Sequence, residues 1–420
     1  MDLKQLLKRM ARRLLLWGLQ GAARPTLHYT VSRPDFSRPP RKLLLIRPDH
    51  LGDVLMLTPA LASLRKALPQ TEITVMVSPS GAASLENNPH IDRIVRCNFP
   101  GMTRQSKSNL LSPYLYALEQ SRQLRAKGYD AAINFRHDYW WGALLLYLAD
   151  IPVRMGYQWP ESRRFLTHQI PQILSSEGLP GPALRPFPQS QQHSVAVNLN
   201  LVQRFLKLYG QKLGPAQTET GLYFQPSPDD ERYIRLQLSE WGINRGQKLV
   251  AIHPGTGATI KLWTVKGFAA VADTLATKHG VRVVFTGGAA EKSLINDILK
   301  TCQTEPLHLD SSGWWGRLAA LFARCDLVIG LDSGPLHLAV AARTPSIHLF
   351  GPTDPAIFGP WGDPAQHRVI RTEIELPCQP CGVLDFQRTC QKGGYCMRTI
   401  KTSQVLAVAE ELIASRISQN

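Results

Sequence analysis

Residues that could carry out chemistry gather in short loops, each of which follows an apolar run of strand length. The first loop is Arg47-Pro48-Asp49-His50-Leu51-Gly52-Asp53, which leaves one such run and enters a helical stretch at Asp53. A carboxylate there could accept a proton from a hydroxyl nucleophile. Gly52 would allow another backbone to approach closely. Capping of the helix is the alternative role of Asp53, because aspartate is a common N-cap residue.

Three further loops lie in the second half of the chain, and together they favour a nucleotide. The loop 253–263 combines small residues with Thr256, Thr259 and Lys261, a set of donors suited to the developing charge of a diphosphate leaving group. In the loop 287–291, Glu291 could accept hydrogen bonds from ribose hydroxyls. The loop 330–337 ends a strand and starts a helix near Pro335, where backbone N–H groups bind anions.

Each of these loops also has an ordinary structural interpretation. The loop 253–263 could be a flexible surface turn. In the loop 330–337, Asp332 or Ser333 could simply cap the helix, and His337 could be a core histidine whose hydrogen bonds are satisfied. None matches the Walker P-loop or the dinucleotide Gly-x-Gly-x-x-Gly pattern. Because all three loops lie at strand-to-helix junctions of the same half, their combination nevertheless indicates a nucleotide site.

The elements that must position these loops are strands and helices in alternation. Strands are expected at 42–46, 73–77, 131–135, 249–253, 281–286, 326–330 and 346–350, with helices at 53–68, 195–209, 265–279, 291–300, 315–324 and from 335. Such alternation implies parallel sheets covered on both faces. Segments 171–194 and 211–230 are rich in Pro, Ser and Gln, and we expect the hinge between two halves there. Ligands of open α/β sheets bind beyond the carboxyl ends of the strands, so the expected site is the cleft between the halves.

The N-terminal segment has a different character. Over residues 3–17, leucines, Met10 and Trp17 fall on one side of a helix, and five Lys and Arg residues fall on most of the other. This pattern suits an anionic membrane surface, and packing on the body of the protein is the alternative. Four prolines in residues 24–40 then predict a tether.

Composition limits the class of protein. The 420 residues include 48 Lys and Arg against 32 Asp and Glu, a formal charge of +16 that suggests an anionic partner. Because these charges are dispersed, we expect no nucleic acid. The longest apolar stretch, around 143–149, is far below the roughly 18 residues of a membrane-spanning helix. The N-terminus lacks a secretory pattern, so we expect a cytoplasmic protein.

Four of the seven cysteines crowd into one short segment, as Cys378, Cys381, Cys390 and Cys396. Structural zinc is one interpretation of these soft ligands. The spacing lacks a second Cys-x-x-Cys, so a reduced loop-stabilising cluster or a redox pair are the alternatives.

Taken in order, these motifs resemble glycosyltransferase family 9, the lipopolysaccharide heptosyltransferase family. The resemblance rests on Ile46-Arg47, Gly52-Asp53-Val54, Thr58-Pro59-Ala60-Leu61, His253-Pro254-Gly255, Lys261-Leu262-Trp263, Gly287-Gly288, Glu291, the run Asp332–His337, the run Phe350–Pro355 and the cysteine tail. It covers residues from about 41 to about 412. It implies a GT-B fold, in which two Rossmann-like doubly wound domains face a cleft. It also implies an inverting, metal-independent transfer from ADP-heptose or a similar nucleotide sugar to a lipopolysaccharide-type or other glycolipid acceptor.

The resemblance also implies roles for single residues. Asp53 corresponds to the general base, Thr256 and Lys261 to phosphate contacts, and Glu291 to a ribose contact. The donor-binding candidates are Thr256, Lys261, Glu291, Asp332, Ser333, Gly334 and His337. Pro48-Asp49-His50 departs from the family pattern and adds a second carboxylate beside Asp53, which leaves the identity of the base open. Arg47, Asp49 and His50 are the acceptor-side candidates, and the idiosyncratic segment near 100–125 is a further one.

The resulting prediction divides the chain into five parts. These are a basic amphipathic helix and tether (1–40), an acceptor-binding domain (41–210), a linker (211–245), a nucleotide-sugar domain with the cysteine tail (246–400) and a C-terminal helix (401–420). The enzyme would need no cofactor for catalysis, structural zinc aside, and would bind the inner face of the plasma membrane peripherally. The alternatives are a non-catalytic nucleotide-sugar or membrane-surface binding protein and an NAD-dependent oxidoreductase, which the missing dinucleotide pattern disfavours.

Overall fold

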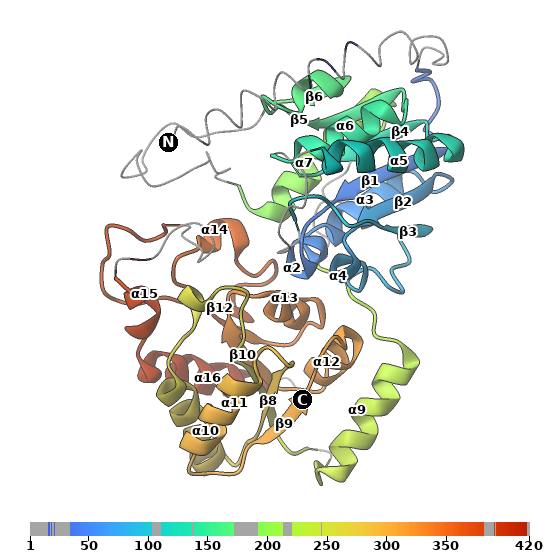
Figure 1. The fold of residues 1–420 in the computed structure, drawn as a ribbon. Helices are drawn as coiled ribbons and strands as arrows, with labels where there is room; N and C mark the ends of the chain where they lie inside the picture. Colours follow the sequence, from blue (N-terminus) through green and yellow to red (C-terminus); the bar gives the residue numbers. More distant parts are fainter. Residues whose placement is uncertain are drawn as a thin grey trace.

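Two parallel sheets of six strands make up the centre of the molecule (Figure 1). The computed structural model describes residues 34–102, 111–136, 138–171, 192–212, 221–244, 246–381, 390 and 392–417, together with Leu16, Gly18 and Gly21. The first sheet has the order β3-β2-β1-β4-β5-β6 and the second β12-β11-β10-β7-β8-β9. The strands are β1 (Lys42–Arg47), β2 (Glu72–Val77), β3 (Arg93–Arg96), β4 (Ala131–Asn134), β5 (Val153–Tyr157), β6 (His168–Ile170), β7 (Leu249–His253), β8 (Arg282–Gly287), β9 (Leu307–Asp310), β10 (Leu327–Leu331), β11 (Ser346–Leu349) and β12 (His367–Ile370).

Both sheets have the same winding order. Within each half the strands run third, second, first, fourth, fifth and sixth across the sheet, and every neighbouring pair is parallel. This is the doubly wound order of Rossmann-like domains, and the predicted α/β architecture is therefore confirmed. The order reverses between β1 and β4 in the first half and between β7 and β10 in the second. Ligands bind at such switch points, outside the carboxyl ends of the strands.

Helices cover both sheets and connect their strands. They are α2 (Leu51–Leu55), α3 (Thr58–Ala67), α4 (Pro79–Ala82), α5 (Ser112–Lys127), α6 (Trp140–Leu148), α7 (Ser194–Leu208), α9 (Pro228–Glu240), α10 (Val265–His279), α11 (Lys292–Thr301), α12 (Trp315–Phe322), α13 (Gly334–Ala341), α14 (Pro355–Phe358), α15 (Tyr395–Arg398) and α16 (Thr402–Ile417), with short 3₁₀ turns at Arg163–Phe165 and Thr259–Lys261. Within the described parts of the chain, no helix is both long and apolar enough to cross a lipid bilayer.

The central strands are buried on both faces, which explains their sequences. Leu43, Leu44, Leu45 and Ile46 of β1 are all fully buried, as is most of β7 and β10. A continuous apolar run is typical of a strand in a parallel sheet covered by helices on both sides. The edge strand β3 lacks this burial, because both of its arginines are exposed.

The predicted helix over 53–68 is two helices. Helix α2 ends at Leu55 and α3 begins at Thr58, whose hydroxyl donates to the carbonyl of Leu55 over 2.7 Å. Pro59 then occupies the first turn of α3, a position that tolerates the missing N–H but cannot continue a preceding helix. This break separates the loop of Asp53 from the long helix behind it.

The region predicted as a hinge contains two well-packed helices. Val195, Leu201 and Phe205 of α7 are buried in one core with side chains of β1 and β2, so α7 packs on the first half. Ile234 and Leu238 of α9 are buried against α12 of the second half. Helix α9 begins at a capping box of Ser227 and Asp230. Because most of its residues are polar, its composition resembles that of a linker.

Most of the predicted N-terminal helix and part of the tether lie outside the described residues. Leu16, Gly18 and Gly21 are helical, and Leu16 is buried in the core that α5 and α6 share with the first sheet. The membrane-binding role of this segment stays a prediction.

Candidate active site

The two halves meet where α2 faces α13 (Figure 1). A side-chain carbon placed on Gly52 would lie 3.0 Å from the Cα of Gly334, and one placed on Gly334 would lie 3.3 Å from the amide nitrogen of Gly52. Leu51 and Leu55 are buried in the same core as Leu336 of α13. The expected close backbone approach at Gly52 is confirmed, and this contact brings the loop after β1 against the loop after β10.

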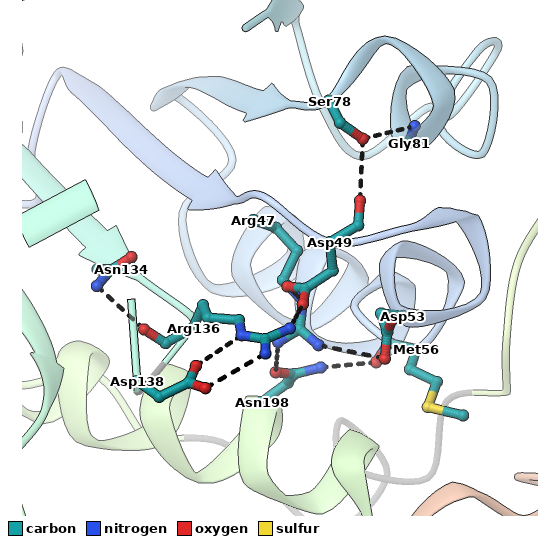
Figure 2. A network of polar contacts seen from close by, with 10 residues as sticks. All are labelled: Arg47, Asp49, Asp53, Met56, Ser78, Gly81, Asn134, Arg136, Asp138 and Asn198. Atoms are coloured by element: carbon teal, nitrogen blue, oxygen red, sulfur yellow. Dashed lines mark hydrogen bonds and ion pairs between the residues drawn. The ribbon is translucent and has the colours of Figure 1, made fainter. Parts of the chain in front are cut away.

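On the first half, the loop of Gly52 also carries an ion-pair network around the buried Asp49 (Figure 2). The side chain of Asp49 is only 1% exposed, its Oδ2 lies 2.7 Å from Nε of Arg47, and its Oδ1 pairs with Arg136. Arg136 follows β4 and also holds Asp138, with 2.6 Å between Nε and Oδ1. The network therefore joins the loops on the two sides of the β1–β4 switch point.

Arg47 is fixed from a third direction as well. Its Nη1 donates to Oδ1 of Asn198 on α7 over 3.2 Å, and Nδ2 of Asn198 donates to the carbonyl of Met56 over 2.9 Å. Its Nη2 lies 3.9 Å from Oδ1 of Asp53. Arg47 is thus a buried connection between the end of β1, the end of α2 and α7.

The two carboxylates of this loop have opposite environments. Burial raises the pKa of Asp49, but Arg47 and Arg136 outweigh it and hold that pKa below its ordinary value. The pKa of Asp53 is raised, because loss of solvation and the charge of Asp49 outweigh the attraction of Arg47, Arg136 and His50. The side chain of Asp53 is also 34% exposed, against 1% for Asp49. Asp53 is therefore the more basic and the more accessible of the two.

Asp53 does not cap the helix, which corrects one of the two roles considered from the sequence. His50 is the N-cap residue of α2 and makes no side-chain cap hydrogen bond, while Asp53 stands two residues inside the helix, in its first turn. His50 itself is exposed. The acceptor-side candidates thus separate into a buried pair, Arg47 and Asp49, and one exposed residue.

On the second half, the loops after β7 and β10 converge on Asp332. Its carboxylate Oδ2 pairs with Nζ of Lys261 at 2.6 Å and accepts from the hydroxyl of Thr353 at 2.5 Å. Thr256 donates to the backbone carbonyl of Asp332 over 3.3 Å. The structure therefore brings three of the predicted donor-binding residues together at the β7–β10 switch point.

The remaining predicted donor-binding residues surround this cluster. Oε2 of Glu291 accepts from the amide of Gly288 over 2.9 Å, and a side-chain carbon on Gly255 would clash with Cγ of Glu291. Ser333 is the N-cap residue of α13, and its hydroxyl donates to the carbonyl of Leu331. His337 is buried, which lowers its pKa to about 4 and keeps its ring neutral.

Several residues of these clusters were given no role in the site from the sequence. Arg136 and Asn198 lie 87 and 151 residues from their partners Asp49 and Arg47, and Thr353 lies 21 residues from Asp332. Arg136 directly follows a predicted strand, so its place at the carboxyl edge of the sheet was a usable signal. Asn198 offers no such signal, because its contact depends on how α7 packs.

The four clustered cysteines line one small cavity beside Ile260 and Pro352. None of them forms a disulfide, and burial together with the other three cysteines raises the pKa of Cys396 to about 11. Among the described residues, no group of three or more His, Cys, Asp or Glu side chains is arranged to hold a metal ion. Zinc at this place stays a prediction.

Two Rossmann-like halves that face each other across such loops make up a GT-B fold. The model of the family "Glycosyltransferase family 9 (heptosyltransferase)" matches residues 183–392, which is half of the chain. The protein belongs to this family and is a glycosyltransferase.

Similar proteins agree with this assignment. The chain is 29% identical over 320 residues to lipopolysaccharide heptosyltransferase 3 of Escherichia coli, covering 74% of this chain and 84% of that one. It is 24% identical to the lipopolysaccharide core heptosyltransferase OpsX of Haemophilus influenzae, covering 79% and 84%.

Two solved structures share the fold. The family 9 glycosyltransferase of Veillonella parvula superposes with a TM-score of 0.68 at 24% identity and covers 89% of this chain and 97% of its own. The E. coli ADP-heptose lipopolysaccharide heptosyltransferase II superposes with a TM-score of 0.66 at 21% identity, covering 89% and 99%.

Proposed function

We propose that this glycosyltransferase moves a heptose from ADP-heptose, or a closely similar nucleotide sugar, to a lipopolysaccharide-core acceptor. The named relatives are lipopolysaccharide heptosyltransferases, and one similar structure is that of the E. coli ADP-heptose lipopolysaccharide heptosyltransferase II. The observation that carries the proposal is the contact of Gly52 with Gly334. It supports the proposal because Gly52, the residue before Asp53, touches the start of α13, which follows Asp332.

In the proposed reaction, Asp53 takes the proton of the acceptor hydroxyl. The hydroxyl oxygen forms a bond to the anomeric carbon from the face opposite the diphosphate, while the bond from that carbon to the diphosphate oxygen breaks with its electron pair. A single displacement of this kind inverts the anomeric configuration. Asp53 ends protonated, and ADP leaves with the electron pair.

The leaving diphosphate needs positive partners, and the second half supplies them. Nζ of Lys261 and the backbone N–H groups at the start of α13 would neutralise the developing charge, as helix N-termini do for phosphates. A diphosphate would compete with Asp332 for Lys261 and draw its ammonium toward the donor. Thr256 and Glu291 would add contacts to the phosphates and the ribose. Because side-chain and backbone groups carry this charge, the proposed step needs no metal.

Asp49 has a supporting role in this proposal. Since it is buried and neutralised by Arg47 and Arg136, it fixes the acceptor-side loop rather than contacting the acceptor. Its negative charge offsets the positive charge of Arg47, which would otherwise lower the pKa of Asp53 and make Asp53 a weaker base. His50, exposed at the start of α2, is the candidate for direct contact with the acceptor.

The glycolipid acceptor would place the enzyme at a membrane. We infer that the protein works peripherally at the cytoplasmic face of the inner membrane, in line with its formal charge of +16 and the predicted basic helix at its N-terminus.

Two measurements test the proposed function. A thermal-shift screen with ADP-, UDP-, GDP- and CDP-sugars should show the largest stabilisation by the ADP-sugar, because bound donor stabilises the folded state. With ADP-heptose and acceptor, Asp53→Asn should lower the rate of ADP release by at least about a hundredfold while ADP binding is retained. Asp138→Asn is the matched control, since it removes a carboxylate of the same loop network that pairs with Arg136.

Turnover that is unchanged in the Asp53→Asn variant would remove Asp53 from the mechanism. Donor binding without transfer to any glycolipid acceptor, by the unmodified chain, would instead favour a non-catalytic nucleotide-sugar protein. A preference for a UDP-, GDP- or CDP-sugar would overturn the proposed donor but not the general reaction.

A further inference from the structure

Helix α5 presents an unusual line of exposed side chains. Leu111, at the N-cap of α5, and Leu115 and Leu118 within it are 52%, 62% and 37% exposed. Their spacing of four and three residues places them on one face of the helix, and Arg122 and Arg125, both exposed, continue the same line. We call these five residues the α5 stripe. It is apolar in its first half and basic in its second.

The opposite face of α5 already performs the structural task of the helix. Ala117, Ser121 and Leu124 are buried, and Ala117 and Leu124 belong to a core shared with α6 and the first sheet. A surface helix normally turns polar residues to solvent on the side away from its core. Three large leucines in a row on that side therefore need another explanation than the packing of α5.

The leucine end of the stripe lies beside the acceptor side of the candidate active site. Nε1 of Trp141 donates to the carbonyl of Pro113 over 2.7 Å, and the rings of Tyr114 and Trp140 are 5.4 Å apart. Helix α6 begins at Trp140, two residues after Asp138. These contacts join the first turn of α5 to the start of α6.

Asp138 connects the start of α6 with the ion-pair network around Asp49. It pairs with Arg136, which pairs with Asp49 in the loop of Asp53 (Figure 2). The first turn of α5 and the network thus share the carboxyl edge of the first sheet, where the β4–α6 loop lies. The arginine end of the stripe points away along α5.

We propose that the α5 stripe rests on the anionic lipid surface that carries the acceptor. This inference rests on the proposed function, in which the acceptor is a glycolipid. The leucines would enter the boundary between headgroups and acyl chains, and Arg122 would bind lipid phosphates. Nη2 of Arg125 donates to the carbonyl of Leu148 at the end of α6 over 2.7 Å, so Arg125 adds positive charge to the stripe rather than a phosphate contact. Helix α5 carries three basic residues and one acidic residue, so its charge complements an anionic surface.

This placement has a consequence for the acceptor. A glycolipid anchored in that surface would present its sugars at the edge of the sheet that holds Arg47, Asp49 and Asp53. The stripe would then raise the effective concentration of lipid-anchored acceptor without contacting the reacting atoms.

The test uses the full chain and sedimentation with vesicles of phosphatidylethanolamine and phosphatidylglycerol, or of phosphatidylcholine alone. The triple variant Leu111→Ser, Leu115→Ser, Leu118→Ser should bind the anionic vesicles at least about tenfold more weakly. Leu236→Ser is the matched control, because Leu236 on α9 is 58% exposed and should not change binding. Arg122→Gln should weaken binding to the anionic vesicles alone, by about fivefold.

Activity separates this inference from the proposed function. The triple variant should keep the turnover of a water-soluble, deacylated acceptor and the thermal shift with ADP, and should lose turnover only of acceptor embedded in vesicles. If the triple variant does not fold, Leu115→Ser alone should still weaken vesicle binding by about threefold. If the unmodified chain transfers no sugar to either acceptor, the proposed function is refuted. The vesicle-binding measurement would still show whether the α5 stripe binds an anionic surface.

Three results would overturn the inference. The first is unchanged vesicle binding by the triple variant. The second is an equal loss on phosphatidylcholine with no effect of Arg122→Gln. The third is a change of oligomeric state in the triple variant with unaltered vesicle binding, which would mean that a second copy of the chain covers the leucines.

Discussion

Replacing Asp49 by Asn should change the pH dependence of the enzyme more than its fold. Asp49 is buried against Arg47 and Arg136, and Arg47 also lies 3.9 Å from Asp53. In the unmodified protein, Asp49 neutralises these arginines and repels the charged form of Asp53, so the pKa of Asp53 is raised. The substitution removes the repulsion and leaves both arginines to act on Asp53.

The size of the effect is an order of magnitude for two like charges on neighbouring side chains, with a separation of about 4 Å assumed for Asp49 and Asp53. Unit charges about 4 Å apart interact by about 4 kcal/mol at an effective dielectric constant of about 20. Because a third of the Asp53 side chain is exposed, we discount this to about 1.4 kcal/mol, which corresponds to about one pKa unit.

Asp53 acts as a base only when it is deprotonated, so activity is lost as pH falls through its pKa. A lower pKa in the Asp49→Asn variant should move the acid limb of kcat/KM down by about one pH unit. A weaker base should also lower the plateau, by about threefold if half of the change in pKa appears in the rate.

The assay is the rate of ADP release as a function of pH, with the ADP thermal shift as a check that the donor site is intact. Asp138→Asn is the control, because it removes the same formal charge from Arg136 without uncovering Arg47. An acid limb that stays in place, or moves to higher pH, in the Asp49→Asn variant would show that Asp49 does not set the basicity of Asp53.

Three further predictions concern the contact between the halves, the diphosphate site and acid stability. Gly52→Ala should lower kcat by at least about tenfold, because its methyl group would press on the backbone of Gly334. Gly221→Ala, which has open space around it, should leave kcat unchanged, and equal kinetics of the two variants would argue against the contact. Lys261→Ala should abolish the thermal shift with ADP that Lys266→Ala keeps, and a retained shift would place the diphosphate elsewhere. Urea unfolding should show a lower free energy of unfolding at pH 4.5 than at pH 7. Histidines of the unfolded chain take up protons below about pH 6.5, whereas the buried histidines of the folded chain resist protonation down to about pH 4. A free energy of unfolding that does not fall would contradict the neutral state of these rings. The buried histidines with pKa values lowered to about 4 are His253, His337 and His367.

The sequence predicts the central part of the fold because burial there leaves a simple pattern. Strands β1, β7 and β10 are covered on both faces, so every residue in them can be apolar, and the expected ranges agree with the structure within two residues. Edge strands such as β3 and β9 have only four residues each, and half of those residues are exposed. So short a pattern does not stand out from a loop.

Helix packing explains the other differences. Helix α7 agrees with the helix predicted over 195–209, whereas α9 lies in the segment predicted as a linker. The apolar residues of α9, such as Ile234, point to a helix only when their partner surface on α12 is known. Composition alone therefore suggested a hinge. In the structure, each helix packs on one half of the molecule.

The site was predictable to the extent that it depends on strand-to-helix junctions. The loops of Asp53, Lys261 and Asp332 each follow a central strand, and parallel strands bring their carboxyl ends to one edge. The role of Asp49 was not predictable, because its partner Arg136 follows β4, and only the sheet order places β4 next to β1. From sequence, Asp49 therefore remained an accessible alternative to Asp53.

An experimental structure with ADP-heptose carrying an unreactive sugar would test the central claim most directly. We predict that its diphosphate lies against Lys261 and the start of α13, with the anomeric carbon facing the carboxylate of Asp53 and room for one hydroxyl between them. A diphosphate bound away from Lys261, or an anomeric carbon turned away from Asp53, would contradict the account.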